Sequence, residues 1–289
     1  MTTTPITPHD EPDNSAVSHI LSRRRLFALG GAVALTGIGA AGHATARSAA
    51  AGTETLSSAR AAAVAADACM QLTSESIEGP YYVDYELFRE DVVEDRTGIP
   101  FTLTLRVVDT ETCEPIPDSA IEIWHCDASG VYSGFTDAGN GGGGGGGGGV
   151  SAQGVPTDDL TWLRGIQMTD DEGHVTFRTV FPGWYTGRAV HIHTKVHTGG
   201  TRTSDGYEGG RTCHTGQFYF EEDAVIATEG ISPYAENTVT RVTLDEDMLY
   251  PGTGTVGGLL DLTYDPEDIE QGVTGSITMA VDPQATNEG

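Results

Sequence analysis

The sequence predicts an all-β fold, a β-sandwich of mainly antiparallel strands joined by long loops. Short runs in the middle of the chain alternate apolar and polar residues, which is the period of a strand with one buried face. Turn-forming residues separate these runs, and no long amphipathic helix lies among them. About eight short strands at this spacing favour a sandwich.

The expected strands begin near residue 101. Phe101 to Val108 alternates clearly, and Ala120 to His125 repeats the pattern after a turn at Pro115 to Asp118. The remaining strand candidates, in chain order, are 163–169, 174–181, 188–197, 216–220, 238–244 and 275–281.

Two glycine-rich stretches interrupt this pattern. A loop at 139–149 contains nine consecutive glycines, Gly141 to Gly149, which would lose too much backbone entropy to hold one conformation. The run lacks the fixed glycine pattern and following helix of a phosphate-binding loop. We expect a mobile surface loop here and similar behaviour at 199–210.

The N-terminus has the layout of an export signal. Arg23 and Arg24 lie within Ser22 to Phe27 and precede an uncharged Gly/Ala-rich stretch, and Ala44-Thr45-Ala46 offers small residues for cleavage. The paired arginines resemble a twin-arginine signal over residues 1–46, so we expect an extracellular or cell-surface protein that meets the membrane only during export. An uncleaved anchor is the alternative, although the stretch is short for a membrane span.

The chain then divides in two. Residues 47–75 are expected to form an Ala/Ser-rich linker, and residues 76–289 the folded β-sandwich domain. Neither part contains another stretch apolar enough to span a bilayer.

The composition is strongly acidic. Asp and Glu number 42 against 15 basic residues, which gives a formal charge of −27. A nucleic-acid partner is excluded, because neutralising phosphates requires a basic face. The basic residues are 14 arginines and one lysine, Lys195. Few lysines and many carboxylates also suit a halophilic protein that must stay hydrated in concentrated salt, which we state as a hypothesis.

Four cysteines are present, Cys69, Cys113, Cys126 and Cys213. Outside the cytoplasm an even number permits two disulfides in three connectivities. Cys113 and Cys126 lie on either side of an expected β-turn, so they are the favoured pair. No CxxC spacing occurs, which argues against a zinc or thiol-redox site.

The residues with the clearest chemistry are two histidines and two tyrosines. If 189–196 is a strand, His191 and His193 project from one face, and this is half of a metal site. The alternative is a pair of polar histidines on a solvated face. Tyr185 follows a Pro-Gly turn just before this strand, and Tyr132 follows another turn. Phenolates are hard oxygen ligands that favour Fe(III), so the set predicts a ferric site.

The motifs extend well beyond these four residues. They lie at 78–82 (Glu-Gly-Pro-Tyr-Tyr), 123–133, 163–170, 181–193 and 215–218. From about Glu78 onward the sequence resembles the intradiol ring-cleavage dioxygenases, which include protocatechuate 3,4-dioxygenase and catechol 1,2-dioxygenase. It is most similar to their exported, single-domain branch, and the family fold is a β-sandwich.

The resemblance implies an enzyme that uses O2 to cleave a catechol-type ring between its two hydroxyl-bearing carbons, giving a muconate-type diacid. It implies a non-haem Fe(III) cofactor and no other. The implied iron ligands are Tyr132, Tyr185, His191 and His193. Tyr185 is implied to be the axial ligand that leaves when substrate binds, Arg188 to lie beside the bound catechol, and Gln217 to lie near the site. The spacing from Tyr185 to His191 is shorter than in protocatechuate 3,4-dioxygenase, so the axial geometry is less firmly implied than the ligand identities.

Two other functions are compatible with the fold. One is a secreted, transthyretin-like β-sandwich that binds aromatic polymer or glycan without catalysis. The other is a metal hydrolase built on the two histidines, which requires a third carboxylate or histidine ligand. Serine-hydrolase chemistry finds no support, because no GxSxG motif occurs. The sequence leaves the particular catechol and the oligomeric state open.

Several neighbouring residues carry open alternatives. Tyr81 and Tyr82 are expected either to line a substrate pocket or to form a packed aromatic pair. Trp124 is expected in the core or in a pocket wall. Arg164 is expected either to support the site or to pair with a nearby carboxylate.

Overall fold

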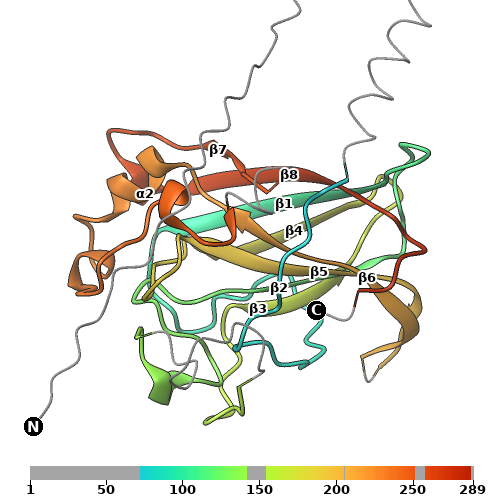
Figure 1. The fold of residues 1–289 in the computed structure, drawn as a ribbon, viewed down its shortest axis with the longest axis horizontal. Helices are drawn as coiled ribbons and strands as arrows, with labels where there is room; N and C mark the ends of the chain where they lie inside the picture. Colours follow the sequence, from blue (N-terminus) through green and yellow to red (C-terminus); the bar gives the residue numbers. More distant parts are fainter. Residues whose placement is uncertain (1–71, 142–153, 205, 251–257, 288–289) are drawn as a thin grey trace, which may run out of the picture. The chain divides into compact units, whose positions relative to one another are not determined.

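The computed structural model describes residues 72–141, 154–204, 206–250 and 258–287. They form two four-stranded sheets, in the orders β4-β1-β8-β7 and β3-β2-β5-β6 (Figure 1). The strands are β1 (Pro100–Asp109), β2 (Ala120–Trp124), β3 (Arg164–Met168), β4 (His174–Val180), β5 (His191–Arg202), β6 (Tyr207–Tyr219), β7 (Asp261–Thr263) and β8 (Val273–Val281). The predicted β-sandwich is confirmed.

The strands pair mostly in the antiparallel sense. Within the described residues, β1 and β8 are the one parallel pair of named strands. In the part of the chain that the structure describes, helical structure is limited to α2 (Glu222–Thr228) and to short 3-10 turns at Thr136–Ala138, Tyr234–Glu236, Leu244–Glu246 and Ile269–Gln271. None of the helices in the described segments is long and apolar enough to cross a membrane.

The hydrophobic core lies between the two sheets. Leu103 and Leu105 of β1 and Phe177 of β4 pack in one cluster with Ile123 of β2 and Ile192 of β5. Each is fully buried, and burying a side chain of this size contributes about 1.5–3 kcal/mol. This alternation turns the intervening residues of β2 and β5 to the opposite, outer face of their sheet.

The outer face of the β3-β2-β5-β6 sheet carries polar and aromatic residues in cross-strand rows. Residues directly opposite each other on paired strands share a face. Two adjacent rows run from β6 through β5 and β2 to β3. The first is Gln217, His193, Trp124 and Arg164, and the second is Thr215, Lys195, Glu122 and Ile166.

Two local expectations are wrong, and one strand was not expected. Residues 238–244 form no strand, because side chains satisfy their polar groups: Val239 O accepts from Trp184, and Arg241 pairs with Glu222. The sequence analysis missed β7, which is only three residues long. The described residues of 199–210 form the end of the β5–β6 hairpin, in which Gly200 pairs with Gly209.

The expected Cys113–Cys126 disulfide is also wrong. Cys126 is a buried thiol whose Sγ donates to Gly183 O at 3.5 Å. The two cysteines precede and follow β2 in the chain, and Cys126 makes its contact with Gly183 instead. Burial raises the pKa of the Cys213 thiol to about 11.

Several predictions concern residues outside the described ranges: the signal at 1–46, most of the linker at 47–75, Cys69, and the glycine run from 142 onward. They stay predictions, as do the domain boundaries.

Candidate metal centre

The four predicted ligand residues converge at one place. The Tyr185 hydroxyl lies 3.1 Å from His191 Nε2, which lies 3.1 Å from His193 Nε2. The Tyr132 ring is 5.7 Å from the Tyr185 ring and 6.2 Å from the His193 ring, centroid to centroid. Tyr185 is 7 % exposed and the other three are 2 % exposed. All four side chains are therefore buried.

The two histidines are held by their neighbours. His191 and His193 alternate with Ile192 in β5, so both imidazoles lie on the outer face of the sheet. His191 Nδ1 donates to Ala189 O at 2.7 Å, which leaves the Nε2 lone pair facing Tyr185. The Trp124 ring stacks on His193 at 4.8 Å with only 9° between the planes, so that ring too is fixed.

The electrostatics keep both imidazoles neutral. Burial lowers the pKa of His191 and of His193 well below the usual value, and the Arg188 guanidinium lowers both further. Burial raises the pKa of Tyr132 and of Tyr185 above the usual value, although Arg188 opposes this for Tyr185. Without a cation, two neutral imidazoles and two protonated phenols face one another.

This arrangement fits a metal ion. Two ligand atoms about 2.1 Å from one metal and roughly 90–100° apart are about 3.0–3.2 Å from each other, which matches both 3.1 Å separations. The Tyr132 hydroxyl is buried without a hydrogen-bond partner among the described residues, so an oxygen donor is left available. No cluster of three or more His, Cys, Asp or Glu suited to a metal occurs in these segments.

Gln217 of β6 lies directly opposite His193 of β5, and Arg188 contacts it. Arg188 Nε donates to Asp247 Oδ2 at 2.9 Å, and its Nη2 donates to Gln217 Oε1 at 2.6 Å and to the Tyr219 hydroxyl at 3.1 Å. Gln217 Oε1 also accepts from the Tyr219 hydroxyl at 3.0 Å. The guanidinium is thus fixed in place before any substrate binds.

The sequence analysis did not identify Asp247. This carboxylate is buried, and besides Arg188 it accepts from the backbone amides of Ala189, Leu249 and Tyr250. Arg188 and these amides hold its pKa below the usual value, against the effect of burial. With so many acidic residues in the chain, composition could not single it out. A local clue was available, because Thr243 and Glu246 form a capping box that ends just before Asp247.

A segment that we call the strap, residues 76–82, covers the site. Ser76 N donates to Thr215 O at 2.9 Å, and Gln217 Nε2 donates to Ile77 O at 3.0 Å. Tyr81 is buried and stacks on Tyr132 at 4.5 Å, so it forms part of the wall of the site.

Arg164 supports the site without pairing to a carboxylate, so the ion-pair alternative is wrong. In the described part of the chain it forms no salt bridge; its side chain donates to Ser133 Oγ at 2.8 Å, to Ser133 O at 2.7 Å and to Tyr81 O at 2.8 Å. It thereby ties the strap to the loop that carries Tyr132.

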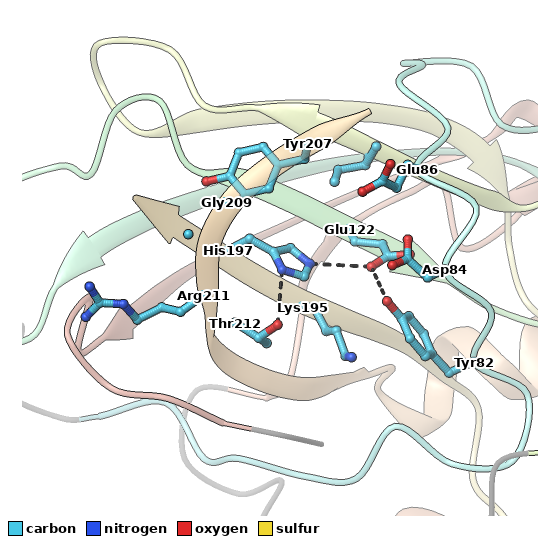
Figure 2. A pocket seen from close by; sticks show the side chains of 12 residues that line it. Tyr82, Asp84, Glu86, Glu122, Lys195, His197, Tyr207, Gly209, Arg211 and Thr212 are labelled. Atoms are coloured by element: carbon cyan, nitrogen blue, oxygen red, sulfur yellow. Dashed lines mark hydrogen bonds and ion pairs between the residues drawn. The ribbon is translucent and has the colours of Figure 1, made fainter. Parts of the chain in front are cut away.

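A cavity of about 370 Å³ opens beyond the strap, on the outer face of the same sheet (Figure 2). Tyr82, Glu122 and Lys195 lie on its side nearest the strap, and Tyr207 and Arg211 lie farther along the hairpin. None of the four candidate ligands lines this cavity.

The chain is similar to known dioxygenases. A family model described as Dioxygenase matches residues 77–264. The chain is 32% identical to the structure of an intradiol ring-cleavage dioxygenase from Tetranychus urticae, with a TM-score of 0.63, over 75% of this chain and 97% of that one. It is 24% identical to a chlorocatechol 1,2-dioxygenase of Pseudomonas putida (72% of this chain, 74% of that protein) and 26% identical to one of Cupriavidus pinatubonensis (61% and 66%). The chain therefore belongs to the intradiol ring-cleavage dioxygenase family.

Proposed function

We propose that the protein is an Fe(III)-dependent dioxygenase that cleaves a catechol-type ring between its two hydroxyl-bearing carbons to give a muconate-type diacid. The observation that carries the proposal is the convergence of Tyr132, Tyr185, His191 and His193 in one buried site. Phenolates are hard, strongly donating ligands that favour Fe(III) over softer divalent ions. A bound ferric ion supplies the Lewis acidity that deprotonates the phenols and activates a chelated catechol toward O2.

The chain's own residues would orient the substrate and neutralise the negative charge that develops on its ring. Tyr185 is the most exposed of the four ligands, which supports its role as the one that yields its position to substrate and takes up a catechol proton. Arg188 is a fixed positive charge whose field acts on His191, and its bonds to Asp247, Gln217 and Tyr219 keep it from reorienting. A guanidinium held this way stabilises negative charge that develops on the ring during reaction.

The test is the visible spectrum of the purified protein after ferric loading, before and after addition of catechol without O2. A phenolate-to-iron band that moves to longer wavelength with catechol is the expected result. A protein that stays colourless after ferric loading contradicts the proposal and favours the non-catalytic binding module.

The substrate is proposed only as a class. Two relatives are named chlorocatechol 1,2-dioxygenases, so 3- and 4-chlorocatechol are to be compared with catechol and protocatechuate in an oxygen-uptake assay. The highest kcat/KM identifies the preferred ring substituent.

We also propose that residues 1–46 direct export by the twin-arginine route to an extracellular or cell-surface location. The support is the arginine pair before an uncharged stretch. Replacing Arg23 and Arg24 with lysine should leave the protein inside the cell. Unchanged secretion of that variant would contradict the proposed route.

A further inference from the structure

We propose that Lys195 is a positioning residue: through Glu78 it holds the strap over His193 and keeps Tyr81 against Tyr132, and so governs catechol binding. The inference rests on the proposed function, because a bound catechol must share the site with these rings. It concerns residues that lie beyond the four candidate ligands and beyond Arg188.

The central contact is a buried ion pair. Lys195 Nζ donates to Glu78 Oε1, and the two residues are 6 % and 9 % exposed. Lys195 is the only lysine of the chain, and arginine stands at every other basic position. A compact ammonium can lie 3.8 Å from the centroid of the Tyr82 ring while it pairs with Glu78, whereas a planar guanidinium needs more room.

The strap is attached to every strand of the sheet beneath it. Side chains bind it from β6 (Gln217 to Ile77 O), β5 (Lys195 to Glu78), β2 (Glu122 to the Tyr82 hydroxyl, 3.2 Å) and β3 (Arg164 to Tyr81 O). These anchors are members of the two cross-strand rows described above, so register places them together. Glu78 and Lys195 form the one charge pair among these anchors.

The Glu122 anchor is itself tied to the hairpin. Figure 2 shows the hydroxyl of Tyr82 directed at Glu122, which also faces His197, whose other ring nitrogen meets Thr212. Lys195 lies on the same side of the sheet as these residues. These contacts link the Tyr82 end of the strap to the β5–β6 hairpin, and all four residues line the cavity.

The strap touches the candidate metal centre at two points. A Cβ on Gly79 would lie 3.3 Å from His193 Cε1, so the strap backbone packs directly on that imidazole. Tyr81 stacks on Tyr132 with 18° between the planes, and its edge faces Tyr185 at 6.1 Å. Tyr82 packs on Trp124, which stacks on His193. Movement of the strap therefore changes the surroundings of at least two of the proposed iron ligands.

A positioning role must be separated from a purely structural one. Removing one partner of a buried ion pair leaves an unpaired charge and destabilises the fold, whereas removing both is often close to neutral. The informative variant is therefore the double substitution Glu78→Met/Lys195→Met, in which side chains of similar length replace both charges. If the ion pair has only a structural role, the double variant should fold and its kinetics should be unchanged.

The experiment combines amide hydrogen exchange with steady-state kinetics on the ferric-loaded protein. We expect the double variant to unfold near the wild-type temperature while the amides of residues 76–82 exchange about tenfold faster or more. We expect KM for catechol to rise about tenfold and kcat to change less than about threefold, because binding geometry is affected more than the chemistry. Anaerobic catechol titration, followed in the visible band, should weaken by the same factor as KM.

Two further variants keep the test decisive. Arg178→Met/Glu90→Met removes an exposed pair at 3.2 Å anchored on β4, in the other sheet, and should change neither strap exchange nor KM. Glu78→Asp keeps both charges but shortens the carboxylate by one methylene, so it should fold and raise KM by about threefold. If the double variant misfolds, the KM of Glu78→Asp decides whether the proposal stands.

Unchanged exchange at 76–82, or faster exchange with an unchanged KM and catechol affinity, overturns the proposal. Absence of catechol turnover by wild-type protein overturns the proposed function instead. The two failures are distinguishable, because exchange reports on the strap whether or not the protein is active.

Discussion

The Asp247 carboxylate binds both the side chain of Arg188 and the backbone of the next residue. Its Oδ2 accepts from Arg188 Nε at 2.9 Å and from the Ala189 amide at 2.7 Å. Replacing Asp247 with asparagine removes the negative charge while keeping the shape. We expect the free energy of unfolding to fall by about 3 kcal/mol, because Arg188 is left buried without its counter-charge. Denaturant titration measures this. Asp245→Asn, on an exposed neighbour, should change it by less than about 0.5 kcal/mol.

The same pair predicts how acid affects stability. The folded-state pKa of Asp247 is below its ordinary value, so its contribution is fully present above the unfolded-state pKa of about 3.9 and is lost as pH falls through the lower, folded-state value. The stability difference between wild type and Asp247→Asn should therefore be constant from pH 7 to about pH 5 and shrink below about pH 4. A difference that grows on acidification would contradict the assignment.

Tyr132→Phe should have opposite effects on the metal-free and ferric proteins. The Tyr132 hydroxyl is buried without a partner in the described segments, so its removal should stabilise the metal-free protein by about 1 kcal/mol. Ferric loading should raise the melting temperature of wild type and raise that of the variant much less.

Tyr234→Phe is the matched control for that substitution. The Tyr234 hydroxyl donates to Phe181 O at 2.6 Å and accepts from Ile99 N at 3.1 Å, so its loss should destabilise both forms by about 1–2 kcal/mol. Equal effects of the two Phe substitutions on the metal-free protein would show that the Tyr132 hydroxyl is satisfied.

Gly79→Ala tests how closely the strap packs on His193. Gly79 has φ +75°, which costs a non-glycine residue about 1–2 kcal/mol, and the added methyl group would also press on the imidazole at 3.3 Å. Gly209→Ala has nearly the same φ, +72°, with nothing within 4 Å of the new methyl group. We expect both to lose stability and only Gly79→Ala to shift the visible band. An unshifted band in Gly79→Ala would mean that the strap yields easily.

The charge of −27 predicts a dependence on salt. Screening of carboxylate repulsion should raise the melting temperature as KCl increases from about 0.1 M toward 1 M, where the Debye length falls from roughly 10 to 3 Å. Folding and activity that are both best at low ionic strength would refute the halophilic hypothesis.

The sequence predicted the parts of the site that depend on local spacing. Alternation in β5 was enough to place His191 and His193 on one face, and the turns before Tyr132 and Tyr185 presented both phenols. The strands of the core were predicted for the same reason, because the alternation of apolar and polar residues is visible in consecutive positions of the sequence. The prediction for residues 238–244 was wrong although they alternate. They pair with no other strand in the described structure, and the carbonyl of Val239 accepts from the Trp184 side chain instead.

The rest depends on contacts between distant segments. Asp247 meets Arg188 across 59 residues, and Glu78 meets Lys195 across 117. No local pattern records which carboxylate faces which cation in a chain with 42 acidic residues. The disulfide prediction failed similarly, because sequence spacing did not show that β2 separates Cys113 from Cys126.

The cross-strand rows of the β3-β2-β5-β6 sheet form only when its strands are correctly aligned, so a property of the site can report on folding. A slip of β5 by one residue would turn His191, His193 and Lys195 toward the core and Ile192 outward. Such a misaligned chain would lose both imidazole donors and the lysine that holds the strap. Uptake of metal, visible as colour, would then report correct strand alignment in refolded protein.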